Sequence, residues 1–86
     1  MAAELLATGS TAANSSDLTV SAGTPVTVGL KGWVTDAKVY IYLKDDAAAY
    51  NLVGKLTAYE PATSITAPGT YRFSRVAGAS CGVFSA

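Results

Sequence analysis

The side chains that could do chemistry in this sequence are few and scattered. The chain contains no histidine, a single cysteine at position 81, and two adjacent carboxylates at Asp45 and Asp46. Without histidine, a serine- or cysteine-type triad lacks its usual base. Cys81 lies between Ser80 and Gly82 and has no nearby basic residue to lower the pKa of its thiol. We therefore expect Cys81 to be a small buried strand residue, and we expect no enzymatic activity.

The two adjacent carboxylates do not predict a metal site either. Calcium requires about six to eight oxygen ligands from spaced residues, and residues 45–49 offer only this pair beside three alanines. A glycine-rich phosphate-binding motif is absent, and nothing supports pairing Glu60 with one of the aspartates as in a glycosidase. We expect a solvated hairpin tip at residues 45–49, and neither metal nor cofactor.

Composition narrows the classes of partner. The chain has 86 residues, six basic and six acidic, and a formal net charge of zero. A nucleic-acid-binding protein usually shows a basic excess, so we expect no nucleic-acid partner. No apolar run approaches the length of a transmembrane helix, and the first residues lack the basic region of a secretory signal. We therefore expect the protein to be synthesised in the cytoplasm and not to associate with a membrane.

Chain length points to association. A domain of this size buries only about 60–65% of its unfolded surface, so its stability is marginal without further support. A single cysteine excludes a disulfide within the chain, and the lack of histidine disfavours a structural zinc site. Oligomerisation, or docking on a larger assembly, remains as the expected source of stability.

The elements that must position these residues are short strands. Apolar and polar residues alternate along much of the chain, and turn signals recur about every 8–12 residues. This pattern predicts an all-β fold, a small antiparallel β-sandwich or barrel of about six to seven short strands. The expected strands are residues 17–21, 26–31, 37–44, 50–60, 64–66, 70–76 and 81–85. We expect residues 1–16 to be an extended N-terminal arm and residues 17–86 a single β domain.

Two of these strands carry specific expectations. Residues 65–76 are interpreted as a hairpin around a type II turn at Pro68 and Gly69. In its second strand Tyr71, Phe73 and Arg75 share the core face, and Arg72 lies on the other. In the strand at residues 50–60, we expect Tyr50, Leu52 and Leu56 to face the core.

Candidate assembly contacts follow from exposed aromatic and apolar positions. In residues 37–44, Val39, Ile41 and Leu43 form a core face, so Lys38, Tyr40, Tyr42 and Lys44 form the opposite face. That second face is either a set of solvated cross-strand pairs or part of an assembly surface. Tyr59 and Arg72 are further candidates for a contact on a sheet face.

Three apolar side chains outside the regular strands have two interpretations each. Leu5 and Leu6 lie in the predicted arm, where they either insert into the protein's own core or reach a neighbouring molecule. Trp33 lies in the predicted loop at residues 32–36, where it either covers the end of the core or is an exposed contact.

Six segments of the chain carry a resemblance to a known family. They read LLATGSTAANSSDLTV, GTPVTVGLK, VYIYLKDD, YNLVGKLT, APGTYRFSR and SCGVF. Together they resemble the small β-rich virion structural proteins of tailed bacteriophages, in particular head decoration (cement) proteins, and the resemblance extends from Leu5 to Phe84.

The resemblance implies a structural role on the capsid surface of a virion. Such a protein binds the major capsid protein, stabilises the head against internal pressure and is often oligomeric, so a trimer is one possibility. The resemblance also makes residues 1–16 a candidate contact with the capsid or a neighbour. Two other functions stay open: a receptor- or carbohydrate-binding module that uses Trp33 and the tyrosines, and a tail or adaptor subunit.

Overall fold

A computed structural model describes residues 3–86 and shows a chain built of strands. Within these residues there is no helix, and therefore none long and apolar enough to span a membrane. The strands are β1 (Ala3–Gly9), β2 (Ala13–Asn14), β3 (Leu18–Val20), β4 (Val26–Lys31), β5 (Lys38–Lys44), β6 (Tyr50–Thr57), β7 (Ala62–Ile65), β8 (Gly69–Arg75) and β9 (Cys81–Ser85).

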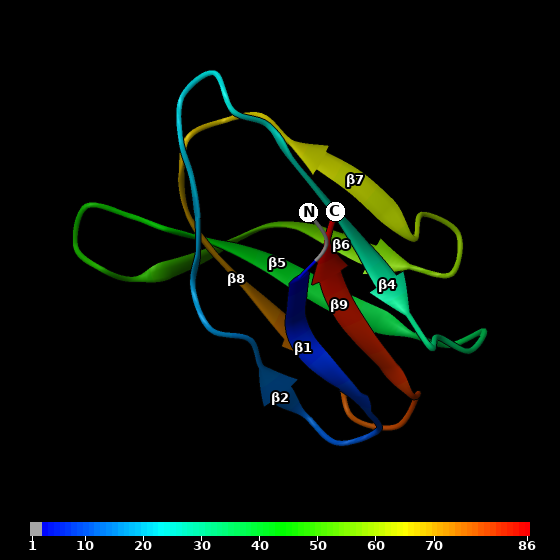
Figure 1. The fold of residues 1–86 in the computed structure, drawn as a ribbon. Coiled ribbons are helices and arrows are strands. Elements are labelled where there is room, and N and C mark those ends of the chain that lie inside the picture. The colour runs from blue at the N-terminus through cyan, green and yellow to red at the C-terminus, as the bar shows by residue number, and fades with distance from the viewer. Residues whose placement is uncertain (1–2) are drawn as a thin grey trace.

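The strands form two antiparallel sheets that pack face to face (Figure 1). Sheet A has the order β1-β9-β4-β7, and sheet B has the order β2-β8-β5-β6 with β3 also paired to β8. This arrangement confirms the predicted all-β sandwich. All seven predicted strands are present, and β1 and β2 are additional.

The core lies between the sheets and takes alternate residues from both. From β5 and β8 of sheet B come Val39, Ile41, Tyr71 and Phe73, and from β4 and β9 of sheet A come Val28, Leu30 and Val83. Cys81 is also fully buried, as predicted. The alternation visible in the sequence therefore identifies the core faces of β5 and β8 correctly.

The described part of the predicted N-terminal arm belongs to the sandwich. β1 pairs with β9, with Ala3 opposite Ser85 and Gly9 opposite Cys81, and β2 pairs with β8. Leu6 is only 8% exposed. The arm prediction fails here because small residues with little side-chain signal form an irregular strand, with two register shifts along β1.

Residues 65–76 are not a hairpin. β7 pairs with β4 in sheet A, whereas β8 pairs with β5 and β3 in sheet B, so residues 66–68 cross between the layers. Gly69 begins β8 with φ of 154°, unlike the value near +80° of a type II turn. The hydroxyl of Tyr71 donates to the carbonyl of Ala67 at 2.8 Å and holds this crossing.

A β-bulge in β6 changes which of its residues face the core. Ile41 pairs with Gly54 while Tyr42 pairs with Leu52, so Val53 is an extra residue in the ladder. The bulge reverses the alternation, and Leu52 is 58% exposed whereas Leu56 is fully buried. The core prediction is thus confirmed for Leu56 and wrong for Leu52 and Tyr50, because a bulge cannot be seen in the pattern of residue types.

Arg75 connects the two sheets from within. Its side chain is buried and projects from β8 toward sheet A. The guanidinium donates from Nη1 to the carbonyls of Ala7 at 2.7 Å and Cys81 at 2.9 Å, and from Nε to the carbonyl of Thr11 at 2.6 Å. One side chain therefore fixes β1, β9 and the segment after β1 against sheet B.

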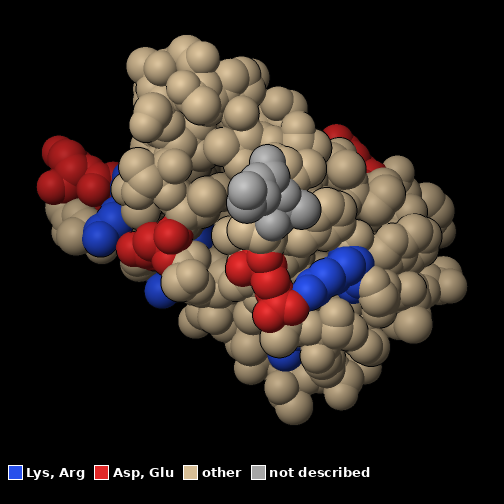
Figure 2. Space-filling model, in the orientation of Figure 1, with Lys and Arg blue, Asp and Glu red and all other residues tan. Residues whose placement is uncertain are grey.

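The outer face of sheet A is poor in charge. In Figure 2, which views the molecule in the orientation of Figure 1, most of the surface is uncharged and the charged side chains form a few small groups. Lys31 of β4 forms an ion pair with Glu4 of β1. The ring of Phe84 lies over Gly29, where a Cβ would come within 3.2 Å of it, so glycine permits this close approach.

Candidate functional site

The outer face of sheet B brings three of the predicted contact residues together. Tyr40 and Tyr42 lie half-buried on the outer side of β5, and Val39 and Ile41, which alternate with them, are buried. Tyr42 is directly opposite Arg72 of β8, and Tyr40 is opposite Lys55 of β6. We call this surface the tyrosine–lysine face; its members are Lys38, Tyr40, Tyr42, Lys44, Tyr50, Leu52, Lys55 and Arg72.

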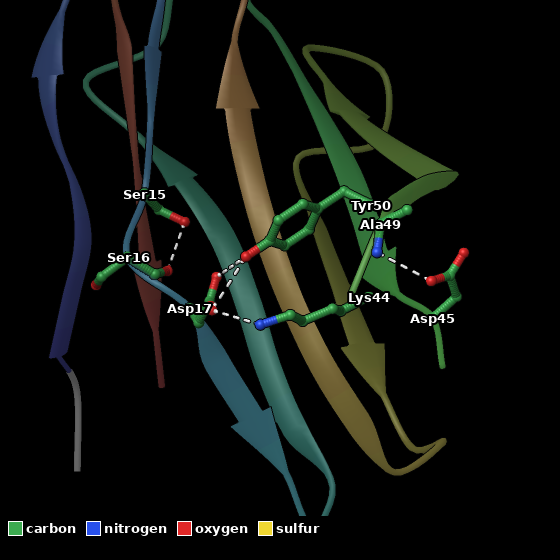
Figure 3. Close-up of polar contacts among 7 residues, drawn as sticks. All are labelled: Ser15, Ser16, Asp17, Lys44, Asp45, Ala49 and Tyr50. Atoms are coloured by element: carbon green, nitrogen blue, oxygen red, sulfur yellow. Dashed lines mark hydrogen bonds and ion pairs between the residues drawn. The ribbon is translucent and has the colours of Figure 1, made fainter. Parts of the chain in front are cut away.

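Tyr50 is the centre of a polar network on this face. Its hydroxyl donates to the carboxylate of Asp17 at 2.8 Å, and the Nζ of Lys44 lies 3.9 Å from the same carboxylate (Figure 3). The guanidinium carbon of Arg72 lies 3.7 Å from the centroid of the Tyr50 ring. The network joins the β5–β6 hairpin to β8 and to the segment before β3, and it holds Arg72 flat against an aromatic ring.

The electrostatics of the network follow from this geometry. The hydrogen bond to Asp17 raises the pKa of Tyr50 above its ordinary value, because it stabilises the protonated phenol beside a carboxylate. The Nε of Arg72 is buried and has no hydrogen-bond partner among the described residues. The guanidinium of Arg72 stacks on Tyr50, and no carboxylate lies within ion-pair distance of it in residues 3–86.

The Asp45–Asp46 pair lies at the tip of the β5–β6 hairpin, as predicted. Asp45 accepts hydrogen bonds from the side chain of Asn51 and from the amides of Ala47 and Ala49, each at 2.9 Å. These hydrogen bonds stabilise the charged carboxylate and so lower the pKa of Asp45, and the bond from Asn51 has the largest effect. Its oxygens are used to close the turn, and no group of three potential metal ligands occurs in residues 3–86.

Two more predicted contacts lie at one end of the sandwich. Tyr59, in the turn after β6, is 94% exposed, and Trp33, in the loop after β4, is 44% exposed. Tyr59 lines a shallow hollow of about 650 Å³ together with Lys38 and Lys55, so it adjoins the tyrosine–lysine face. Trp33 does not line this hollow.

Leu5 and Leu6 are separated from the other candidates. Leu6 is buried opposite Val83 in the core, and Leu5 packs partly against the same core. Of the two interpretations of this pair, insertion into the protein's own core applies.

Sequence reasoning missed the network partners of Arg72. The sequence predicts Asp17 only as the first residue of a strand, and it predicts Tyr50 on the core face. A carboxylate immediately before an apolar strand is only a weak signal that Asp17 bonds to a side chain on the sheet surface. Nothing in the residue types alone indicates the β6 bulge that brings Tyr50 outward.

The fold and surface together define a class: a small two-layer antiparallel β-sandwich with an aromatic and cationic sheet face. Comparison with known protein families and with curated proteins finds no match. Among solved structures, the chain is similar to the SPBc2 prophage-derived protein YomS, known from a crystal structure. The TM-score is 0.68 over 99% of this chain and 88% of that one, with 13% sequence identity. At this identity the likeness shows a shared fold.

Proposed function

We propose that this chain is a non-enzymatic structural protein of a phage virion, a capsid decoration (cement) protein that binds the major capsid protein on the outer capsid lattice and stabilises the head. The observation that carries the proposal is the tyrosine–lysine face. Tyrosine and arginine are enriched in protein interfaces, and here two tyrosines and Arg72 lie side by side on a rigid sheet. The fold shared with a prophage-derived protein supports a phage context.

The dimensions of the domain suit this role. Its extents of 33 × 28 × 20 Å describe a flat body whose broad side covers on the order of 900 Å². A standard protein interface buries about 800 Å² of each partner. One side of the sandwich can therefore supply a complete interface while the opposite side faces solvent or another copy, such as a neighbour in a trimer.

The test uses heads of the phage that encodes the chain, prepared without it. The purified chain is added, and its co-sedimentation with heads and the temperature of head disruption are measured. We expect saturable binding, a raised disruption temperature, and a loss of both on replacing Tyr42 with alanine, since truncation of a central interface tyrosine costs more than about 1 kcal/mol. Thr27→Ala, at an exposed position of β4 in sheet A, is the matched control and should bind as the original chain does.

A receptor- or carbohydrate-binding module is the second candidate, and the exposure of Trp33 and Tyr59 favours it. Exposed aromatic rings can stack on sugars, and both rings lie at the end of the sandwich that carries the β4–β5 loop and the β6–β7 turn. A glycan array with the original chain and Trp33→Ala separates the two functions. Binding that Trp33→Ala abolishes would favour the module, and localisation of the chain to tails in particle images would favour a tail or adaptor subunit.

A further inference from the structure

Within residues 3–86, β7 is the sheet edge that lacks a feature known to block the addition of another strand. Proteins usually protect sheet edges by short length, charged residues or bulges. β1 has two register shifts and carries Glu4, β6 has the bulge at Val53 and carries Lys55, and β2 and β3 are short. By contrast, β7 pairs with β4 in unbroken register from Ala62 to Ile65, without a charged residue or a proline. Figure 1 shows it at the outer edge of sheet A, beyond β4.

The register of β7 identifies the backbone groups that are free at this edge. The amide of Leu30 donates to the carbonyl of Pro61 at 2.8 Å, and the same register continues along β4 and β7. Successive residues of an antiparallel strand direct their N–H and C=O groups to opposite sides, so those of Ala62 and Ser64 point away from β4. Because β4 is the only strand paired with β7 within residues 3–86, these groups have no strand partner there.

A groove beside this edge opens between the two sheets. It has a volume of about 480 Å³, with β7 and the residues after it on one side and β6 on the other. Buried Ile65 and Tyr71 and exposed Val53 contribute apolar surface. Lys55 and Glu60 contribute one charge of each sign, so the groove has no net formal charge. Its lining therefore suits uncharged, apolar side chains.

A strand added to β7 would direct every second side chain into this groove. Ser64 is exposed and Ile65 is buried. Residues of the added strand that bond to Ala62 and Ser64 would therefore have their side chains in solvent, and the residues between them would face the groove. Where a peptide extends a sheet, main-chain hydrogen bonds supply affinity and pockets for alternate side chains supply specificity. The edge and the groove together provide both.

A second copy of the chain fits this edge less well than an extended segment does. If β7 paired with the β7 of another copy about a two-fold axis, the two grooves would open toward each other across that axis. The inward residues of β7, Thr63 and Ile65, line the groove of their own copy. The β7 strand of either copy would therefore have no side chain with which to fill the groove of the other.

We propose that β7 binds an extended segment of another polypeptide as an added antiparallel strand of sheet A, with the backbone of Ala62 and Ser64 as its hydrogen-bonding partners. The segment is uncharged and has apolar side chains at alternate positions, which enter the groove between β7 and β6. The inference goes beyond the proposed function, because it assigns a site at the open side of the sandwich and not on the tyrosine–lysine face.

The first experiment uses two isomeric peptides of alternating threonine and valine with a lysine at each end. In the first peptide the valine amides are N-methylated, so only the threonines can bond to β7 and the valines must face the groove. In the second peptide the threonine amides are N-methylated, which reverses the two faces. In an NMR titration of the original chain, we expect the first peptide to shift the amide signals of residues 62–66 and to bind at least about fivefold more tightly, because burial of a valine side chain is favourable. Equal affinity, or no shift with either peptide at millimolar concentration, would overturn the inference.

The second experiment compares Ser64→Pro with Ser64→Ala. Proline removes the outward N–H of residue 64 and is tolerated on an edge strand, whereas alanine keeps this N–H. We expect Ser64→Pro to bind the first peptide about three- to tenfold more weakly than Ser64→Ala, because one backbone hydrogen bond is lost. Equal binding by the two folded variants would overturn the inference. If Ser64→Pro does not fold, the comparison of the two peptides, which leaves the protein unchanged, still decides.

Sedimentation equilibrium tests the alternative occupant. We expect the original chain and Ser64→Pro to have the same mass at every concentration. A dimer that forms in the original chain and is lost in Ser64→Pro would identify a second copy as the occupant of the edge and overturn the proposal. None of these experiments uses phage heads, so their failure is distinct from a failure of the proposed function.

Discussion

Replacing Arg75 with methionine is expected to lower the free energy of unfolding by about 2–4 kcal/mol. The guanidinium donates three hydrogen bonds to backbone carbonyls, and hydrogen bonds from charged donors contribute about 1.5–3 kcal/mol each. Part of this loss is offset, because methionine needs no desolvation of a charge and fills a similar volume. The carbonyls of Ala7 and Thr11 belong to exposed residues and can bind water, whereas that of buried Cys81 stays without a donor.

The effect should be large on the scale of this domain. An 86-residue domain has a total stability of about 4–13 kcal/mol at about 0.05–0.15 kcal/mol per residue. A loss of about 3 kcal/mol corresponds to a melting temperature lower by about 12–24 °C. Urea unfolding followed by circular dichroism gives the free energy, and amide hydrogen exchange should show that β1 loses protection first, since Arg75 bonds to Ala7 within it.

Arg72→Met is the matched control, because it removes the same group from the same strand on the outer face. Its stacking on Tyr50 is worth about 0.5–1 kcal/mol at a partly exposed site. Arg75→Lys should also destabilise, since an ammonium cannot reach three carbonyls with the geometry of a guanidinium. If Arg75→Met unfolds at the same urea concentration as Arg72→Met, the buried guanidinium does not hold the two sheets together.

Three further predictions concern single positions. Gly69→Ala should destabilise by about 1–3 kcal/mol, because φ is 154° and the new Cβ would lie 2.8 Å from Leu43; an unchanged urea midpoint would contradict this. Burial raises the pKa of the Cys81 thiol, so the contribution of this group to stability is present below the ordinary value of 9.0 and is lost as pH rises through the folded value. Labelling of Cys81 by a thiol reagent should require unfolding, and fast labelling of the native chain would refute burial. The pKa of Asp45 is lowered from 3.8, so the turn that it closes should lose that support as pH falls through the folded value. The Ala47 and Ala49 amides should lose protection, measured as exchange relative to the intrinsic amide rate at each pH, at low pH in the original chain and at all pH values in Asp45→Ala; identical protection in both chains would contradict the role of the carboxylate.

The sequence predicts most of the strands, but it predicts little of how the strands pair and how the two sheets are connected. The core face of a strand with strict alternation, such as β5, can be predicted because every second residue is apolar. β1 and β2 carry mainly small or polar residues, so their pairing depends on partners far along the chain. The crossing at residues 66–68 looks like a hairpin turn locally, and only the tertiary pairing of β7 with β4 shows otherwise.

The tyrosine–lysine face is likewise predicted from the sequence only in part. Alternation alone places Tyr40, Tyr42 and Arg72 on the outward faces of their strands, but the pairing of β5 with β8 is needed to bring them onto one sheet side. Their network could not be predicted, because the outward turn of Tyr50 depends on the bulge at Val53, and the contact with Asp17 spans 33 residues. Arg75 was placed correctly on the core face, but a role for a buried cation requires knowledge of the carbonyls around it.

The place of β9 in sheet A has a consequence for the way the protein forms during synthesis. β9 lies between β1 and β4, so the strand of this sheet that is synthesised last separates two that are made early (Figure 1). Until β9 emerges, β1 has no ladder in sheet A, and the carbonyl of Cys81 is not yet available to Arg75. Such long-range pairing makes folding slow, because a loop of nearly the full chain must close first. The domain should therefore complete its fold only after β9 has been synthesised, with β4 and β1 exposed to chaperones until then.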